Sequence, residues 1–145
     1  MKNFIKSFSL EEVEQIFASI NEKSYRAKQL FNWLYERNVD NFNAMTNFSK
    51  KLRQYLTDNY EISAIQLIDR KKSNSDGTEK FLFATHDNHF IESVFIRNDG
   101  TDEGRLTICV SSQIGCPMGC TFCETAKIGF KRNLECAEIL DQINK

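Results

Sequence analysis

The stretch Cys109-Val-Ser-Ser-Gln-Ile-Gly-Cys116-Pro-Met-Gly-Cys120-Thr-Phe-Cys123 contains four of the five cysteines in this 145-residue chain. Its last three cysteines have the spacing Cys-x3-Cys-x2-Cys, in a segment that also holds two glycines and the only proline. Three thiols can converge on one centre only if the backbone between them turns sharply, which glycine permits. The spacing therefore predicts that Cys116, Cys120 and Cys123 bind a metal.

Two kinds of metal centre are compatible with three thiols. Tetrahedral zinc needs a fourth ligand, for which the candidates are Cys109 on the preceding strand and the distant His86 or His89. An iron-sulfur cluster accepts three thiolates and leaves one position open. The residues alone favour the cluster and keep zinc as the alternative.

Upstream of this loop, four short segments are rich in β-branched and aromatic residues, as strands are. Turn-forming runs at residues 74–77 and 98–100 separate them. His86 and His89 flank a further polar turn and are interpreted as ordinary hairpin residues. We therefore expect an antiparallel meander of three or four strands, over residues 62–69, 79–85, 89–97 and 105–111.

The first 60 residues have the periodicity of helices instead. Ser9 and Glu12 form a capping-box pattern at the start of a first helix. Ser24 is expected to cap a second helix and Asn38 to end it, and a third helix is expected over residues 49–60. The apolar stripes of the three helices predict the core of a small helical bundle.

One more helix is expected after the cysteine loop, with Asn133 as its cap. Four of its apolar side chains would share one face, namely Cys136, Ile139, Leu140 and Ile143. Cys136 is therefore interpreted as a core residue and not as a ligand. An exposed apolar side on this helix is expected to make the chain prone to association.

Composition limits the classes of protein that fit the chain. Hydrophobic residues make up 41% and charged residues 27%, which is typical of a soluble globular protein. The net charge of -1 does not by itself predict nucleic acid or membrane as a partner. The sequence has neither an apolar run of membrane-spanning length nor a signal peptide, so we expect a cytoplasmic protein with reduced thiols. A complete eight-fold barrel is excluded, because it needs at least roughly 200 residues.

Together with its flanks, the cysteine motif resembles the RlmN/Cfr family of radical S-adenosylmethionine (SAM) RNA adenine methyltransferases, and the RlmN branch most. Phe122 directly before the last cysteine is part of this resemblance. The resemblance extends over nearly the whole chain, but only over the N-terminal portion of such an enzyme. The segments that carry it are residues 25–34, 91–94, 109–116 and 123–134.

The resemblance implies an α+β fold leading into α/β. A helical accessory domain would occupy residues 1–60 and an antiparallel strand region or connector residues 61–104. Residues 105–145 would be the start of a radical SAM core, that is, the first βα unit of a truncated partial barrel.

The resemblance also implies roles for individual residues. Cys116, Cys120 and Cys123 would hold a 4Fe-4S cluster that cleaves SAM to a 5'-deoxyadenosyl radical, and Phe122 would contact the cofactor. A second SAM would methylate a late cysteine, through which the protein becomes covalently attached to the RNA. Cys109 would resolve that adduct, and Glu92 would position or deprotonate groups nearby.

Partners follow from the same resemblance. The RlmN branch methylates adenine position 2 in 23S rRNA and in some tRNAs, whereas the Cfr branch methylates position 8, and an electron donor such as flavodoxin is implied. Cations after the cluster motif are candidates for RNA contact, with Phe130 between them: Lys127, Lys131 and Arg132. Two further basic groups are weaker candidates, Lys50, Lys51 and Arg53, and Arg70, Lys71 and Lys72.

The methyl-carrying cysteine and most of the barrel have no counterpart in the sequence. We therefore expect the chain alone to be inactive, with the rest of the barrel on a separate chain if the protein is split. The alternative from another class is a non-catalytic RNA-binding or remnant fragment, whose cysteine site is empty or holds zinc.

Overall fold

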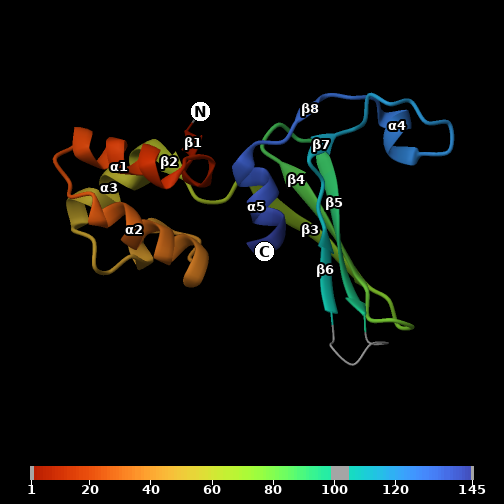
Figure 1. The fold of residues 1–145 in the computed structure, drawn as a ribbon, viewed down its shortest axis with the longest axis horizontal. Coiled ribbons are helices and arrows are strands. Elements are labelled where there is room, and N and C mark those ends of the chain that lie inside the picture. The colour runs from red at the N-terminus through yellow and green to blue at the C-terminus, as the bar shows by residue number, and fades with distance from the viewer. Residues whose placement is uncertain (1, 99–104, 145) are drawn as a thin grey trace. The chain divides into compact units, whose positions relative to one another are not determined.

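The structure is a computed structural model that describes residues 2–98 and 105–144. It separates into a helical unit that ends at Ala64 and a sheet unit that begins at Ile65 (Figure 1). This is a mixed helix and sheet fold, as the sequence predicts. No helix among the described residues has the length and apolar character that a membrane crossing requires.

The helical unit is built from short elements around one core (Figure 1). Its two short strands pair in parallel. In chain order the elements are β1 (Asn3–Phe4), the 3-10 helix η1 (Ile5–Ser7), α1 (Leu10–Ser19), α2 (Tyr25–Phe31), the π-helix η2 (Asn32–Glu36), the 3-10 helix η3 (Phe42–Ala44), α3 (Lys50–Asn59) and β2 (Tyr60–Glu61).

Local side-chain chemistry sets most of the helix ends. The Ser9 backbone N–H donates to Glu12 Oε2 at 2.7 Å and the Glu12 N–H donates to Ser9 Oγ, so the predicted capping box is confirmed. Ser49 caps α3 in the same way. Asn38 has a φ of +47° and ends the second helical segment, as expected. The expected Ser24 cap is wrong, because Ser24 already has helical backbone angles and its side chain accepts no capping bond.

The core of the helical unit combines all three α-helices. The predicted apolar stripes are confirmed, and Phe17, Leu30 and Leu34 are fully buried. Ile62 belongs to this core as well. The first strand of the sheet therefore begins three residues later than the predicted Ile62, because Ile62 is packed among helices.

The sheet unit is an antiparallel meander in the order β3-β4-β5-β6, which confirms the predicted topology (Figure 1). Its strands are β3 (Ile65–Lys72), β4 (Glu79–Thr85), β5 (Phe90–Asn98) and β6 (Arg105–Cys109). The first strand therefore replaces the predicted 62–69, and the last strand ends at Cys109 instead of Ser111. Part of the predicted turn at residues 98–100 lies outside the described residues.

After β6 the chain forms a second, smaller sheet and two helices. β7 (Gln113–Ile114) pairs antiparallel with β8 (Arg132–Asn133), and α4 (Glu124–Ile128) lies between them in sequence. α5 (Cys136–Asn144) then packs on the larger sheet through Ile139, which contacts the core around Phe83. β6 is antiparallel to β5, and no described strand is its parallel partner, so the finer expectation of an opening barrel unit stays a prediction.

The final helix corrects two predictions. Asn133 does not cap it, because Asn133 pairs with Gln113 in the small sheet, and the Glu138 carboxylate instead accepts from the Glu135 N–H at 2.8 Å. The buried face of the helix is Ala137, Glu138, Asp141 and Gln142, whereas Cys136 is exposed. The interpretation of Cys136 as a core residue is therefore wrong. The hydrogen bonds and ion pair of Glu138 hold a partly polar side of the helix inward, and of the predicted apolar stripe Ile139 packs against the core.

Candidate functional site

The three clustered cysteines lie on a loop whose two ends touch. Gly115, directly before the first of them, has a φ of +71°, and a Cβ added there would lie 1.8 Å from the Gly129 carbonyl oxygen. The β7–β8 pairing continues this closure, since the Lys131 N–H donates to the Ile114 carbonyl at 2.9 Å. Residues 116–128 therefore project from a narrow neck that only glycine at position 115 permits.

Within the loop the cysteines differ in exposure. Cys116 and Cys123 are half-buried and Cys120 is exposed, and all three are free thiols. A backbone hydrogen bond of 3.1 Å from the Cys123 N–H to the Cys120 carbonyl forms the turn between them. Two apolar side chains of the loop are open to solvent, with Met118 76% and Phe122 89% exposed. The loop thus presents thiols next to uncovered apolar groups.

This donor set fits the cluster that the sequence predicts. Three cysteines with no disulfide partner supply three thiolates, and the closed neck keeps their loop short. The sulfur atoms are not gathered into a compact trio here. Among the described residues, the group of three ligand atoms within 4.8 Å of one another comprises His86, Asp87 and Glu138 instead. The three cysteines therefore fit a cluster in their chemistry and sequence spacing, and not in the present positions of their sulfur atoms.

Cys109 and Glu92 lie on the same face of the large sheet. Cys109 ends β6 opposite Val94 of β5, and side chains of directly paired residues share a face, as do residues two apart on a strand. Both side chains are exposed, and Glu92 forms an ion pair of 2.7 Å with Lys80. The Ser111 hydroxyl donates to the Glu92 carbonyl at 2.7 Å, which ties the segment after Cys109 to the same strand.

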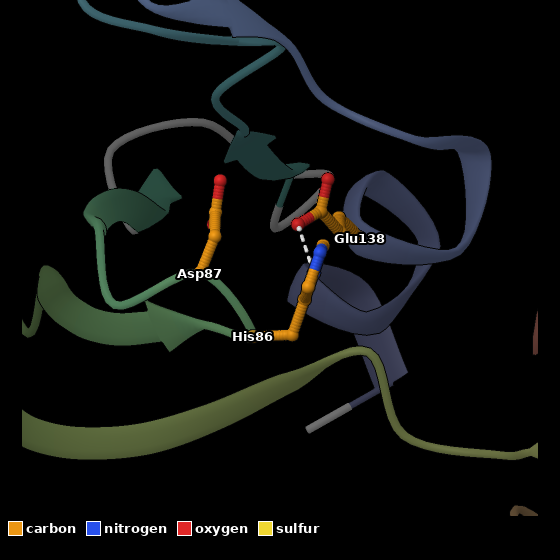
Figure 2. Close-up of side chains that lie close together, drawn as sticks. All are labelled: His86, Asp87 and Glu138. Carbon is orange, nitrogen blue, oxygen red and sulfur yellow. Dashed lines mark ion pairs between the residues drawn. The ribbon is translucent and has the colours of Figure 1, made fainter. Parts of the chain in front are cut away.

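The exit strand of the cysteine loop is fixed by an ion-pair network at Arg132. Its guanidinium donates to Asp87 in the β4–β5 turn at 2.8 Å and to both oxygens of Glu138 on α5 at 2.7 and 2.8 Å. His86 Nδ1 lies 3.6 Å from Glu138 Oε1, and Figure 2 shows His86 and Asp87 approaching Glu138 from the turn. Because Arg132 already occupies the cation position between the two carboxylates, these residues form an ion-pair network and not a metal site.

Electrostatics in this network favour the ionised carboxylates. Hydrogen bonds from Arg132 hold the pKa of Asp87 far below its usual value. Burial by itself raises the pKa of Glu138, but hydrogen bonds from Arg132 and the Glu135 N–H outweigh it and lower the pKa overall. Arg132 in turn has its pKa raised, by Glu138 first and Asp87 second. The pair Arg132–Glu138 is therefore charged at neutral pH, with Glu138 fully buried.

The structure also sorts the predicted RNA-contacting cations. Arg132 is engaged by two carboxylates, and Lys127 pairs with Glu124, whereas the exposed Lys131 forms no ion pair with any described residue. Arg70 pairs with the buried Glu79, and Arg53 donates to the Asn43 carbonyl. His86 and His89 flank the β4–β5 turn, which confirms the hairpin interpretation. Sequence reasoning missed the contact of His86 with Glu138, which no local pattern signals.

Comparison with known proteins shows that the chain is similar to part of RNA methyltransferases. Residues 3–62 match the family model described as the ribosomal RNA large subunit methyltransferase N-terminal domain. The chain is 43% identical over 141 residues to a probable dual-specificity RNA methyltransferase RlmN of Bacillus velezensis, covering 97% of this chain and 38% of that protein. It is 42% identical over 143 residues to the protein of the same description from Thermotoga neapolitana, covering 99% and 40%.

The fold is similar as well. The crystal structure of a radical SAM methyltransferase from Sphaerobacter thermophilus superposes with a TM-score of 0.86 and 33% sequence identity. The match covers 98% of this chain and 40% of that one. The chain thus spans about two fifths of the length of the relatives it matches.

Proposed function

Because the chain corresponds in sequence and in fold to the N-terminal portion of RlmN-type radical SAM RNA methyltransferases, we propose that it carries the cluster-binding loop and the helical accessory region of such an enzyme. The activity of the whole enzyme would be methylation of adenine at position 2 in 23S rRNA, and in tRNA, through a methyl-cysteine. The description of the relatives as dual-specificity RNA methyltransferases supports two RNA substrates.

One observation carries this proposal, namely the closed loop with three free thiols. Cys116, Cys120 and Cys123 would be the protein ligands of a 4Fe-4S cluster, whose iron without a protein ligand would bind SAM. When bound, the cluster supplies the electron that cleaves SAM to a carbon-centred radical. The chain's own contribution is to hold this chemistry in place through the Gly115–Gly129 neck, with Phe122 as apolar cover for the cofactor.

Cys109 and Glu92 would act together on the face of the large sheet that they share. The Cys109 thiol is free and exposed, so a substrate group can reach its Sγ. Glu92 is held by Lys80 and can orient a polar group on the face that it shares with Cys109. We propose that Cys109 resolves the protein–RNA adduct and that Glu92 is its positioning residue.

Anaerobic reconstitution of the 145-residue chain with iron and sulfide tests the proposal. We expect about four irons per chain, visible-range absorbance near that of a 4Fe-4S cluster, and a matching Mössbauer spectrum. Cys120→Ala should lose the cluster, because Cys120 is a ligand. Cys136→Ala is the matched control, since Cys136 is also an exposed free cysteine but lies outside the loop, and it should keep the full iron content.

Stoichiometric zinc that resists replacement by iron would contradict the proposal and support the zinc-bound fragment instead. Catalysis is tested separately with labelled SAM and an rRNA fragment. We expect no methyl transfer to adenine by these residues alone, because none of the five cysteines matches the methyl-carrying cysteine of the family. Label in adenine would overturn that expectation without affecting the cluster result.

A further inference from the structure

We propose that a polar groove on the helical unit binds a single-stranded segment of RNA. The groove has a volume of about 490 Å³ and lies between the second helical segment and residues 46–47. It combines two cations, one indole and three amides: Lys28, Arg37, Trp33, Gln29, Asn32 and Asn47. It lies in the helical unit and shares no residue with the cysteine loop, so it is a binding site in addition to the proposed cluster site.

The groove is formed by an unusual helical turn. After α2 the chain continues as the π-helix η2, in which the Arg37 N–H donates to the Asn32 carbonyl at 3.1 Å. π-helical turns are rare and recur at functional sites. The widened turn brings the Arg37 guanidinium to 4.2 Å from the centroid of the Trp33 ring. A planar cation and an aromatic ring therefore stand together at the groove.

Hydrogen bonds hold the opposite wall in place. The Trp33 Nε1–H donates to Asn47 Oδ1 at 2.7 Å. Arg26 donates both to Gln29 Oε1 and to the Asn47 carbonyl, each at 2.8 Å. The groove is thus fixed before any ligand binds, which lowers the entropic cost of binding.

The chemistry of the lining favours RNA. Among the described residues, no carboxylate lines the groove, and Lys28 and Arg37 offer two exposed cations that attract phosphate. Indole and guanidinium planes are surfaces on which unpaired bases stack, and side-chain amides read base edges. An acidic peptide would use the cations but neither the stacked planes nor the amides. The choice of RNA as ligand also rests on the proposed function, since the proposed enzyme acts on RNA.

The test uses the fact that Trp33 is the only tryptophan in the chain. A 12-nucleotide single-stranded RNA of mixed sequence is titrated into the 145-residue chain at low salt, and the Trp33 fluorescence is followed together with the anisotropy of a label on the RNA. We expect quenching of Trp33 with the same midpoint as the rise in anisotropy. An oligoglutamate peptide of equal charge should leave the fluorescence unchanged.

Matched variants remove one positive charge each. Arg37→Gln should weaken RNA binding about tenfold, because it removes a stacking plane, and Lys28→Gln should lower the slope of affinity against salt by about one. Lys23→Gln is the control, since the exposed Lys23 precedes α2 but does not line the groove, and it should change affinity less than about twofold. All three positions are on the surface, so far-UV circular dichroism should be unchanged.

The possible outcomes separate this inference from the proposed function. RNA that raises the anisotropy without quenching Trp33 would place binding elsewhere and refute the groove site. Equal effects of Lys28→Gln, Arg37→Gln and Lys23→Gln, quenching by oligoglutamate, or no RNA binding at all would refute it too. Failure to assemble the iron-sulfur cluster would refute the proposed function and leave a positive groove result standing.

Discussion

The helical unit buries its apolar residues, whereas the sheet unit leaves many of its own uncovered. In the helical unit, fully buried side chains from all three α-helices meet in one core. The core of the sheet unit is smaller and consists of Ile65, Phe83, Ile91, Ile114 and Leu134. Several of its large apolar side chains are exposed, including Leu106, Ile108 and Ile143. The helical unit is thus held by packing, and the sheet unit also depends on polar contacts.

Among the described residues, the helical unit buries one charged side chain, Lys6, and the sheet unit buries three. In the sheet unit Glu79, Glu138 and Asp141 are buried, and Glu79 and Glu138 are paired with arginines. A buried ion pair tolerates little change, because removing one partner leaves the other charge without compensation. The difference teaches that stability resides mainly in the helical core, while the sheet unit holds the exposed chemical groups in a specific arrangement.

The largest effect is expected from a cavity in the helical core. Phe17 is fully buried, so Phe17→Ala should lower the free energy of unfolding by about 3–5 kcal/mol. Urea unfolding followed by Trp33 fluorescence measures this, because Trp33 packs against that core. The contrast between the two units would be refuted if Ile108→Ala, at an exposed position of the sheet unit, lowered the free energy of unfolding by as much. We expect less than about 1 kcal/mol there.

The neck of the cysteine loop should be the most sensitive point of the sheet unit. Gly115→Ala puts a Cβ 1.8 Å from the Gly129 oxygen at a φ of +71°, so the backbone must shift, and we expect a loss of about 2 kcal/mol and markedly less cluster on reconstitution. Gly119→Ala is the control, because its φ is +65° but a Cβ there meets nothing within 4 Å. Hydrogen exchange of residues 112–134 compares the two variants. Equal protection in both would contradict the claim that the close approach of Gly115 to Gly129 holds the loop closed.

The two units should respond to pH in opposite directions. The pKa values of Asp87 and Glu138 are lowered in the folded state, so their stabilisation is present above the ordinary values of 3.8 and 4.5 and is lost as the pH falls below them. Burial, with a contribution from Tyr55, raises the pKa of Tyr60 in the helical unit from 10.0 to about 12. Its stabilisation is therefore complete below pH 10 and is lost as the pH rises towards 12.

The loss of stability in acid and the loss in alkali can both be measured by circular dichroism and Trp33 fluorescence over a range of pH values. Glu138→Gln should destabilise the sheet unit at neutral pH, because Arg132 loses an ionic partner, and should flatten its response to acid. Tyr60→Phe should reduce the alkaline loss in the helical unit and leave the acid response unchanged. The same acid midpoint in Glu138→Gln and the unaltered chain would argue against the role of the Arg132 network.

The smallest effect on stability is expected at the uncovered apolar surface. Ile143 is 52% exposed on α5, so Ile143→Lys should change the free energy of unfolding by less than about 0.5 kcal/mol. It should nevertheless reduce concentration-dependent association, measured by light scattering, because it interrupts an apolar patch. Unchanged association would mean that this face is not the one through which copies of the chain meet.

Predictions from the sequence succeeded where the cause is local. The Ser9–Glu12 box and the end at Asn38 depend on neighbouring residues, and both are confirmed. The four strands follow from β-rich runs between turns. One error is local, namely the expected cap at Ser24. The other errors concern residues whose surroundings are distant in sequence, such as Ile62 in the helical core and Cys136 on the solvent side of α5.

The candidate site divides in the same way. The cysteine spacing and the glycines Gly115 and Gly119 can be read from the sequence. The preference for an iron-sulfur cluster over zinc follows from the same residues. The roles of Cys109 and Glu92 stay predictions, to which the structure adds that both lie on one sheet face. The Arg132 network joins residues 45 positions apart, and no periodicity or motif indicates it.

The sequence by itself indicated the main helices, the four-stranded meander and the three cysteines predicted to bind a metal, because these features depend on side-chain chemistry and short-range spacing. The short strands β7 and β8 and the helix α4 were not predicted from the sequence. Only the tertiary structure decided that Gly115 touches Gly129, that α5 buries its polar face, and that Arg132 is held by carboxylates and is not free for RNA. These are contacts between segments far apart in the chain, and their geometry is set by packing, which no local pattern encodes.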